Sequence, residues 1–192
     1  VHAANSPAPL TGATTPSIHL ATTFARTPDG ALPSEHLYAR ISNPNRDQLE
    51  AALVALESGA HAAAFASGCA AITALLQALK PGDTVVCTSD CYSGTREILT
   101  DLMSGWGLVV RFADLWDEST WERDIPTGTR LVWAETPSNP QLRITDVAKL
   151  AEFAHSQGAL LVCDNTFASP FLQNPIRQGA DLVVHATTKY LS

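Results

Sequence analysis

The sequence predicts an α/β fold with a mostly parallel sheet, helices on both faces of that sheet, and an extended N-terminal arm before it. Two observations lead to this prediction. Short apolar runs rich in Val, Leu and Ile alternate with segments whose apolar residues recur at helical spacing. Several of these runs stop at polar, reactive residues, as expected at the carboxyl ends of parallel strands, where ligands bind.

The composition is that of a globular protein with one sizeable core. The chain has 192 residues, of which 45% are hydrophobic and 16% are charged. Its net charge of −7 argues against a nucleic-acid partner, because binding phosphates needs a basic face. Residues 1–10 do not have the pattern of a signal peptide, and no apolar run is long enough to cross a bilayer. We therefore expect a cytoplasmic protein with no nucleic-acid or membrane partner.

The four cysteines are Cys69, Cys87, Cys91 and Cys163, and none forms a CxxC pair. Cys87 and Cys91 are close enough in sequence for a metal or redox role to be considered, but reduced, packed thiols are the favoured interpretation. The sequence therefore predicts no metal site.

Residues 1–45 are rich in Pro, Thr, Ser and Asn and have no helical period, which predicts an extended arm. Such an arm cannot bury itself. We expect it to lie over a neighbouring subunit or another part of the protein, with a disordered tail as the alternative for the first dozen residues. Residues 46–192 are expected to form the large domain.

The large domain begins with a helix. Three leucines at helical spacing predict that it starts near Arg46 and stops before Gly59. A short apolar segment at 61–65 is predicted to be a strand, which leads into a turn of small residues and then an amphipathic helix around 72–79.

The same alternation continues to the end of the chain. Strands are expected at 84–88, 108–112, 130–135, 159–164 and 181–185. Helices are expected at 95–104 and 146–155, whereas residues 116–124 have no clear pattern.

Two of the expected strands lead to groups suited to cofactor chemistry. Lys189 follows the last strand, and a partly desolvated lysine can act as an amine nucleophile and form a Schiff base. Asp164 ends the preceding strand and could hold a pyridinium nitrogen. A lysine after a strand is more often simply solvated, so this interpretation depends on the other parts of the site.

Three other segments could supply those parts. Ser67-Gly68-Cys69 opens a helix, where backbone N–H groups could bind one phosphate, although a tight turn would look the same. Tyr92 could stack on a flat cofactor or simply pack. Asn139 lies between two prolines and could present its amide to a ring oxygen or belong to a plain turn.

Together these segments resemble the pyridoxal-phosphate-dependent transsulfuration enzymes of cysteine and methionine metabolism. That family includes cystathionine γ-synthase, the cystathionine lyases, methionine γ-lyase and the homoserine-ester sulfhydrylases. The resemblance covers almost the whole chain and lies in Tyr38-Ala39-Arg40-Ile41-Ser42-Asn43-Pro44, Ala66-Ser67-Gly68, Asp90-Cys91-Tyr92, Glu135-Thr136-Pro137-Ser138-Asn139-Pro140, Asp164-Asn165-Thr166-Phe167 and His185-Ala186-Thr187-Thr188-Lys189-Tyr190.

The resemblance implies the large domain of a fold-type I PLP-dependent transferase, with pyridoxal 5'-phosphate (PLP) as cofactor. It makes Lys189 the Schiff-base lysine and Asp164 the partner of the pyridine nitrogen. Tyr92 would stack on the ring and take part in catalysis, and Asn139 would bind the ring hydroxyl. The implied phosphate ligands are Ser67, Gly68, Cys69, Thr187 and Thr188 of the same subunit, with Tyr38 and Arg40 reaching across from a neighbouring subunit.

The sequence departs from the family pattern in three places. Ala186 stands where a serine is common, so one phosphate hydrogen bond of about 1–3 kcal/mol is expected to be absent or supplied by Thr187. Cys69 replaces a frequent methionine. The chain has about half the family's length, so we expect it to be a fragment. The small C-terminal domain, with the arginine that grips the substrate carboxylate, would lie beyond Ser192.

The resemblance implies a small amino-acid substrate and self-association as a dimer or tetramer. The expected reaction is γ-replacement on an O-acylated homoserine by cysteine to give cystathionine, because residues 16–20 and 172–175 resemble the synthase branch. The alternatives are a cystathionine β- or γ-lyase, a methionine γ-lyase and a homoserine-ester sulfhydrylase. A non-catalytic truncated subunit and another phosphate-ligand-binding α/β protein also remain open.

Overall fold

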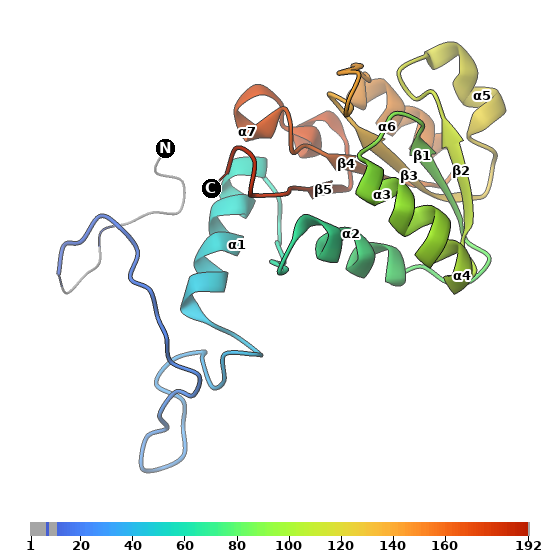
Figure 1. Cartoon of the computed structure of the whole chain (residues 1–192). Coiled ribbons are helices and arrows are strands. Elements are labelled where there is room, and N and C mark those ends of the chain that lie inside the picture. The colour runs from blue at the N-terminus through green and yellow to red at the C-terminus, as the bar shows by residue number, and fades with distance from the viewer. Residues whose placement is uncertain (1–6, 8–10, 192) are drawn as a thin grey trace. The chain divides into compact units, whose positions relative to one another are not determined.

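A computed structural model describes residue 7 and residues 11–191 of the chain (Figure 1). The chain divides into two compact units, residues 1–64 and residues 65–192. The sequence-based boundary at residue 45 falls inside the first unit. Helix α1 (Pro44–Glu57) therefore groups with the arm and not with the sheet.

The start and end of helix α1 follow from its sequence. The Asn43 side chain accepts a hydrogen bond from the Asn45 N–H, and Pro44 follows at the first helical position, where its missing N–H costs nothing. The helix ends at Ser58, which takes a left-handed conformation with φ of 60°. The helix thus stops before Gly59, as predicted.

The arm before α1 is irregular, and most of its residues between 11 and 35 are exposed. It nevertheless pairs with itself at one place, through an antiparallel bridge between Thr23 and Tyr38. The Phe24 N–H donates to the Leu37 carbonyl at 3.0 Å beside this bridge.

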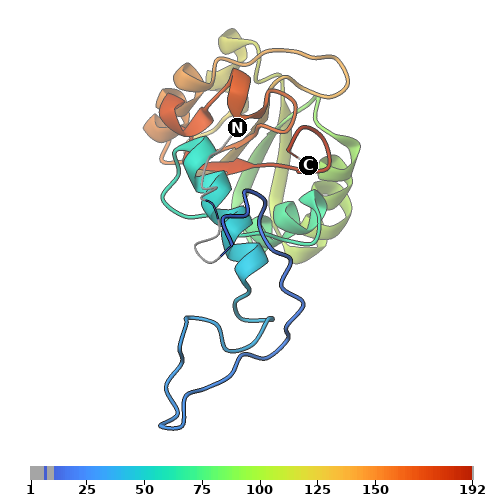
Figure 2. The same cartoon turned by 90° about the vertical axis from the view of Figure 1, so that its left-hand side faces the viewer.

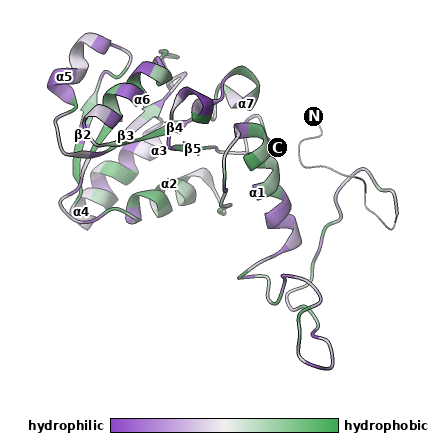
Figure 3. Ribbon diagram, turned by 180° about the vertical axis from the view of Figure 1, so that it is seen from behind, coloured by the Kyte–Doolittle hydropathy of each residue, from purple (hydrophilic) through white to green (hydrophobic). Residues whose placement is uncertain are grey.

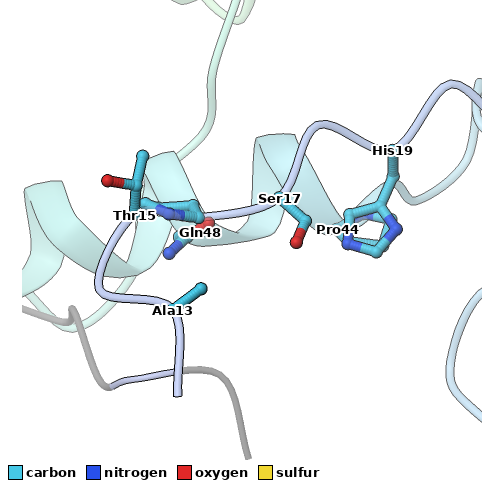
Figure 4. A pocket seen from close by; sticks show the side chains of 7 residues that line it. Ala13, Thr15, Ser17, His19, Pro44 and Gln48 are labelled. Atoms are coloured by element: carbon cyan, nitrogen blue, oxygen red, sulfur yellow. The ribbon is translucent and has the colours of Figure 1, made fainter. Parts of the chain in front are cut away.

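A small pocket lies between residues 13–19 and the first turn of α1 (Figure 4). The Asn45 side chain accepts from the His19 N–H at 3.0 Å and donates to the His19 carbonyl at 2.9 Å, which fixes this stretch to the helix. The pocket has a volume of about 190 Å³, and none of the predicted site residues lines it.

The second unit is built on a five-stranded sheet in the order β2-β1-β3-β4-β5. All of its strand pairs are parallel, which confirms the predicted sheet. The strands are β1 (Thr84–Thr88), β2 (Val109–Ala113), β3 (Thr129–Glu135), β4 (Leu160–Asp164) and β5 (Leu182–Val184).

Helices cover both faces of the sheet, as predicted (Figures 1 and 2). On one face, Val85, Leu131 and Val162 pack against residues of α2 and η1. On the other, Val132 and Leu161 pack against α6. Figure 3 shows α2 and β4 as mainly hydrophobic, in agreement with their buried positions. The helices are α2 (Gly68–Gln77), α3 (Ser93–Glu97), the π-helical η1 (Ile98–Met103), α4 (Ser104–Trp106), η2 (Glu118–Thr120), α5 (Trp121–Asp124), α6 (Val147–Ser156), α7 (Ser169–Leu172) and η3 (Pro175–Gln178).

The predicted strand at 61–65 was wrong. The structure has no strand there, and Phe65 is 48% exposed. The segment is largely alanine, which has low strand propensity and little apolar area to bury, so a place in the sheet would have stabilised it weakly.

The segment 116–124, which had no clear sequence pattern, contains the short helices η2 and α5. Trp121 anchors it, because its ring is buried and its indole N–H donates to the Leu115 carbonyl at 3.0 Å. Its helices are too short for a period to show in the sequence.

Within residues 7 and 11–191, no helix is long and apolar enough to cross a membrane. The same residues contain no group of three or more His, Cys, Asp or Glu side chains that could hold a metal ion. Cys87, Cys91 and Cys163 are buried, Cys69 is partly buried, and no disulfide joins them.

Candidate functional site

Two carboxyl groups lie next to each other at the carboxyl ends of the central strands. Glu135 ends β3, Asp164 ends β4, and the two residues are in register. Both are buried, with 6% and 8% of their surface exposed. Two acids so close, with little water around them, disfavour double ionisation.

Burial raises the pKa of Asp164, although hydrogen bonds from Thr166 and the charge of His185 oppose this rise. Burial and, to a smaller extent, the neighbouring Asp164 raise the pKa of Glu135 to about 8. A cation bound next to Asp164 would favour the ionised form of this carboxyl group. A protonated pyridine nitrogen is such a cation.

The loop after β5 is fixed to the residues that follow Asp164. The Asn165 N–H donates to the Val184 carbonyl at 3.0 Å, and the Ala186 N–H donates to the Thr166 hydroxyl at 2.9 Å. The Thr166 N–H in turn donates to the Asp164 carboxylate at 3.0 Å. Thr166 therefore links the carboxylate of Asp164 to the loop that carries Lys189.

Lys189 lies in the turn that follows this loop, where its N–H donates to the Ala186 carbonyl at 3.2 Å. It is exposed, so the expectation of a partly desolvated lysine was wrong for this structure. The strand β5 ends at Val184, and the chain is exposed at residues 188–190, after the partly buried residues 185–187.

The N-terminus of α2 lies against the same loop. The Ser67 hydroxyl accepts the Ala70 N–H at 3.1 Å and caps the helix, which leaves the first N–H groups available to an anion. A Cβ atom on Gly68 would lie 3.0 Å from the Cβ atom of Ala186. Gly68 thus allows the helix N-terminus to approach the segment that continues into Thr187 and Thr188.

We expect Gly68→Ala to destabilise this contact. The added methyl group overpacks the space beside Ala186, so the free energy of unfolding should fall by about 1–3 kcal/mol. Gly105→Ala is the matched control, since a Cβ atom there meets nothing within 4 Å and alanine favours the helix by about 0.5–1 kcal/mol. Urea unfolding of both variants measures the difference, and equal stability of the two would contradict the close approach.

Tyr92 precedes α3 and is held through its main chain. Its N–H donates to the Glu135 carboxyl at 2.9 Å, while the residue is 43% exposed. The ring lies over Gly94, where a Cβ atom would come within 2.4 Å of the Tyr92 Cε1 atom. The lack of a side chain at Gly94 therefore leaves the space that the Tyr92 ring occupies.

Asn139 belongs to a closed loop between β3 and α6. The Ser138 N–H donates to the Arg143 carbonyl at 3.0 Å, and the Ser138 hydroxyl accepts the Arg143 N–H at 2.9 Å. The Ser138 hydroxyl donates to Asp90, which also accepts the Gln141 N–H at 3.2 Å. The peptide bonds before Pro137 and Pro140 are cis. This network holds Asn139 on a defined loop at the end of β3.

A pair of amides fixes the start of that loop to the end of β4. Gln173 donates to the Thr136 carbonyl at 3.2 Å and to the Asn165 side chain at 3.1 Å. The Asn165 side chain donates back to the Gln173 carbonyl at 3.1 Å. The loop that carries Asn139 and the strand that ends at Asp164 are thereby held together.

Sequence reasoning missed the supporting residues Glu135, Asp90, Thr166 and Gln173. The first three stand in segments already noted for the resemblance, yet their roles depend on contacts between strands distant in sequence. For Glu135 the sequence did offer a signal, because an apolar strand ends there in an acid directly before Thr136-Pro137.

Tyr38 and Arg40 belong to the first unit. The Arg40 guanidinium carbon lies 4.9 Å from the centre of the Tyr38 ring, a cation–π contact. Arg40 is exposed and Tyr38 is half-buried in this unit.

Comparison with known proteins decides the family. The model of the Cys/Met metabolism PLP-dependent enzymes matches residues 1–192. The chain belongs to this family. Its members depend on PLP, and its large domain has the fold-type I architecture, as the resemblance implied.

Two relatives and one solved structure of this PLP-dependent family illustrate the similarity. The chain is 42% identical over its whole length to cystathionine gamma-lyase of Dictyostelium discoideum and covers 50% of it. It is 45% identical to cystathionine gamma-synthase of Mycobacterium tuberculosis, again over the whole chain and 50% of the relative. The crystal structure of metB from Corynebacterium glutamicum matches 98% of the chain with a TM-score of 0.92 and 39% identity, and the chain covers 49% of it.

The chain thus spans about half the length of the curated relatives it matches. The residues that it does contain fit PLP in their chemistry. The first N–H groups of α2 suit a phosphate, and the buried Asp164 carboxylate suits a pyridinium nitrogen. The loop that carries Lys189 is fixed next to both by Ala186 and Thr166.

Proposed function

We propose that this family member, in its functional assembly, replaces the γ substituent of an O-acylated homoserine with cysteine and forms cystathionine. The observation that supports a PLP site here is the link from Asp164 through Thr166 to the Lys189 loop, with Gly68 packed on the same loop. The 45% identity to a cystathionine gamma-synthase favours the synthase reaction.

Each of the following residues would hold one part of the cofactor. Asp164 would hold the pyridine nitrogen in its protonated form, and Asn139 would donate to the ring hydroxyl. Tyr92 would stack on the ring. The N–H groups of Gly68 and Cys69 and the hydroxyls of Ser67, Thr187 and Thr188 would bind the phosphate, with Tyr38 and Arg40 of a neighbouring subunit completing the set.

Bound PLP supplies an electron sink for the carbanion formed at the substrate's Cα. Lys189 would hold the cofactor and, once its amine is free, move protons at Cα and Cβ. The acyl group leaves Cγ as a carboxylate, the sulfur of cysteine forms the new bond to Cγ, and the thiol proton is released.

The products formed with and without cysteine distinguish replacement from elimination. The 42% identity to a cystathionine gamma-lyase makes elimination the second candidate. With O-succinylhomoserine and cysteine we expect cystathionine and succinate as the main products, measured by mass spectrometry. A keto acid, ammonia and succinate without any cystathionine, both with and without cysteine, would instead support a lyase.

We propose further that two subunits share each site, because Arg40 is exposed beside the half-buried Tyr38 in the first unit. The four cysteines form no disulfide, which favours a reducing compartment such as the cytoplasm. Sedimentation velocity would test self-association as a dimer or tetramer, and a monomer that binds PLP with full affinity would oppose a shared site.

A further inference from the structure

Glu135 is a buried acid at the end of β3 for which the proposed chemistry has no role. Its carboxyl accepts the Tyr92 N–H at 2.9 Å, and the backbone N–H of Asn139 also faces it. Across the strand pair it is in register with Asp164. One carboxyl therefore contacts the main chain of two proposed ring-binding residues and adjoins the third.

We propose that Glu135 is a positioning residue, which fixes where Tyr92 and Asn139 lie relative to Asp164. It thereby sets the plane in which the cofactor ring lies. This inference rests on the proposed function, because it concerns the same three ring contacts. It assigns Glu135 no contact with substrate or cofactor.

The connectivity of the chain explains why one carboxyl can do this. Tyr92 follows β1, Asn139 follows β3, and Asp164 ends β4, so the three residues come from separate strand ends. Among the described hydrogen bonds, the contact of Tyr92 with Glu135 is the one that joins the Tyr92 N–H to β3. Removal of the carboxyl would leave this part-buried N–H without its acceptor, while Asp90 would still join the two loops through Ser138 and Gln141. The position of the Tyr92 main chain relative to β3 would then no longer be fixed at the end of the strand.

The groups around Glu135 favour an uncharged acceptor. Burial, Asp164 on β4 and Cys91 before α3 raise its pKa to about 8 against the opposing hydrogen bonds from Tyr92 and Asn139, so the acid is mostly protonated at neutral pH. A neutral Glu135 leaves the negative charge on Asp164, where a pyridinium would need it. Glutamine has the size and hydrogen-bonding groups of the protonated acid, so it should take over the positioning role.

The test compares Glu135→Ala, Glu135→Gln and Glu135→Asp in the PLP-loaded protein, with Glu122→Ala in an exposed part of α5 as the control. The first readout is the circular dichroism of bound PLP, which reports how the ring is held. The second is the separation of kcat from KM. The third is the labelling of Lys189 after borohydride reduction, which reports cofactor attachment independently of ring position.

We expect Glu135→Ala to lose most of the PLP dichroism and to lower kcat by about 10²-fold, the cost of a misplacement of about 1 Å, with little change in KM. Lys189 should still be labelled. Glu135→Gln should restore the dichroism and kcat, whereas Glu135→Asp, which is one methylene shorter, should not. The Glu122→Ala control should match the wild type.

Two results would overturn the inference: unchanged dichroism and kcat in a folded Glu135→Ala protein, or a folded Glu135→Gln protein as defective as the alanine variant. If the alanine variant does not fold, the comparison of Gln with Asp decides in the same way. Failure of the wild type to label Lys189 would instead contradict the proposed function itself, so the two failures can be distinguished.

Discussion

Lys189→Ala is expected to remove the activity of the PLP-loaded protein. The proposed role of this amine is both to hold the cofactor and to move protons, and loss of one positioned acid–base group lowers rates by about 10²–10⁴-fold. Loss of the attachment to the cofactor adds to this effect. The assay is cystathionine formation from O-succinylhomoserine and cysteine, together with the absorbance spectrum of bound PLP.

The chain offers a matched control, since its three lysines are Lys80, Lys149 and Lys189. Lys149 pairs with Glu118 at 2.8 Å on the outer surface, so Lys80→Ala is the cleaner comparison. It should keep both the spectrum and the rate. A Lys189→Ala protein with the wild-type spectrum and rate would rule out the assigned role.

The second large effect is expected from Asp164→Asn. The asparagine keeps the size of the side chain but lacks the charge that holds the pyridine nitrogen protonated, so the electron sink is weakened. A hydrogen bond to a charged group contributes about 1.5–3 kcal/mol, so PLP affinity should fall about 10–100-fold. The rate should fall further, because the lost proton matters in the chemical step as well as in binding.

Fluorescence titration with PLP measures the affinity, and the cystathionine assay measures the rate. Asp101→Asn serves as the control, because Asp101 is exposed in η1 and belongs to no proposed cofactor contact. Equal affinity and rate for Asp164→Asn and the wild type would show that the carboxylate does not hold the ring.

The sequence was sufficient to predict the sheet because its strands are buried. β1, β3 and β4 are buried over nearly their whole length, so their residues form continuous apolar runs that contrast with the flanking helices. The polar residue at the end of such a run marks the edge of the sheet where ligands bind. Asp164 was found in this way.

Other features depend on contacts between distant parts of the chain. The apolar run at 61–65 has the local pattern of a strand, but whether it joins the sheet depends on a partner strand that local sequence does not specify. The bridge between Thr23 and Tyr38 likewise joins two stretches of the arm that have no strand pattern of their own.

The supporting residues of the candidate site are of the same kind. Glu135 was expected only as the last residue of a strand, and its importance follows from its register with Asp164 and its bond to Tyr92. The exposure of Lys189 was also not predictable, because it depends on where β5 ends. Residue identity revealed the candidate chemistry, and the topology was needed to find what positions it.

The central claim is that Lys189 carries PLP next to Asp164. The most direct test is borohydride reduction of the PLP-loaded protein, followed by proteolysis and mass spectrometry of the lysine-containing peptides. We expect a pyridoxyl group on Lys189 and none on Lys80 or Lys149. A pyridoxyl group on either of these other lysines, or on no lysine at all, would contradict it.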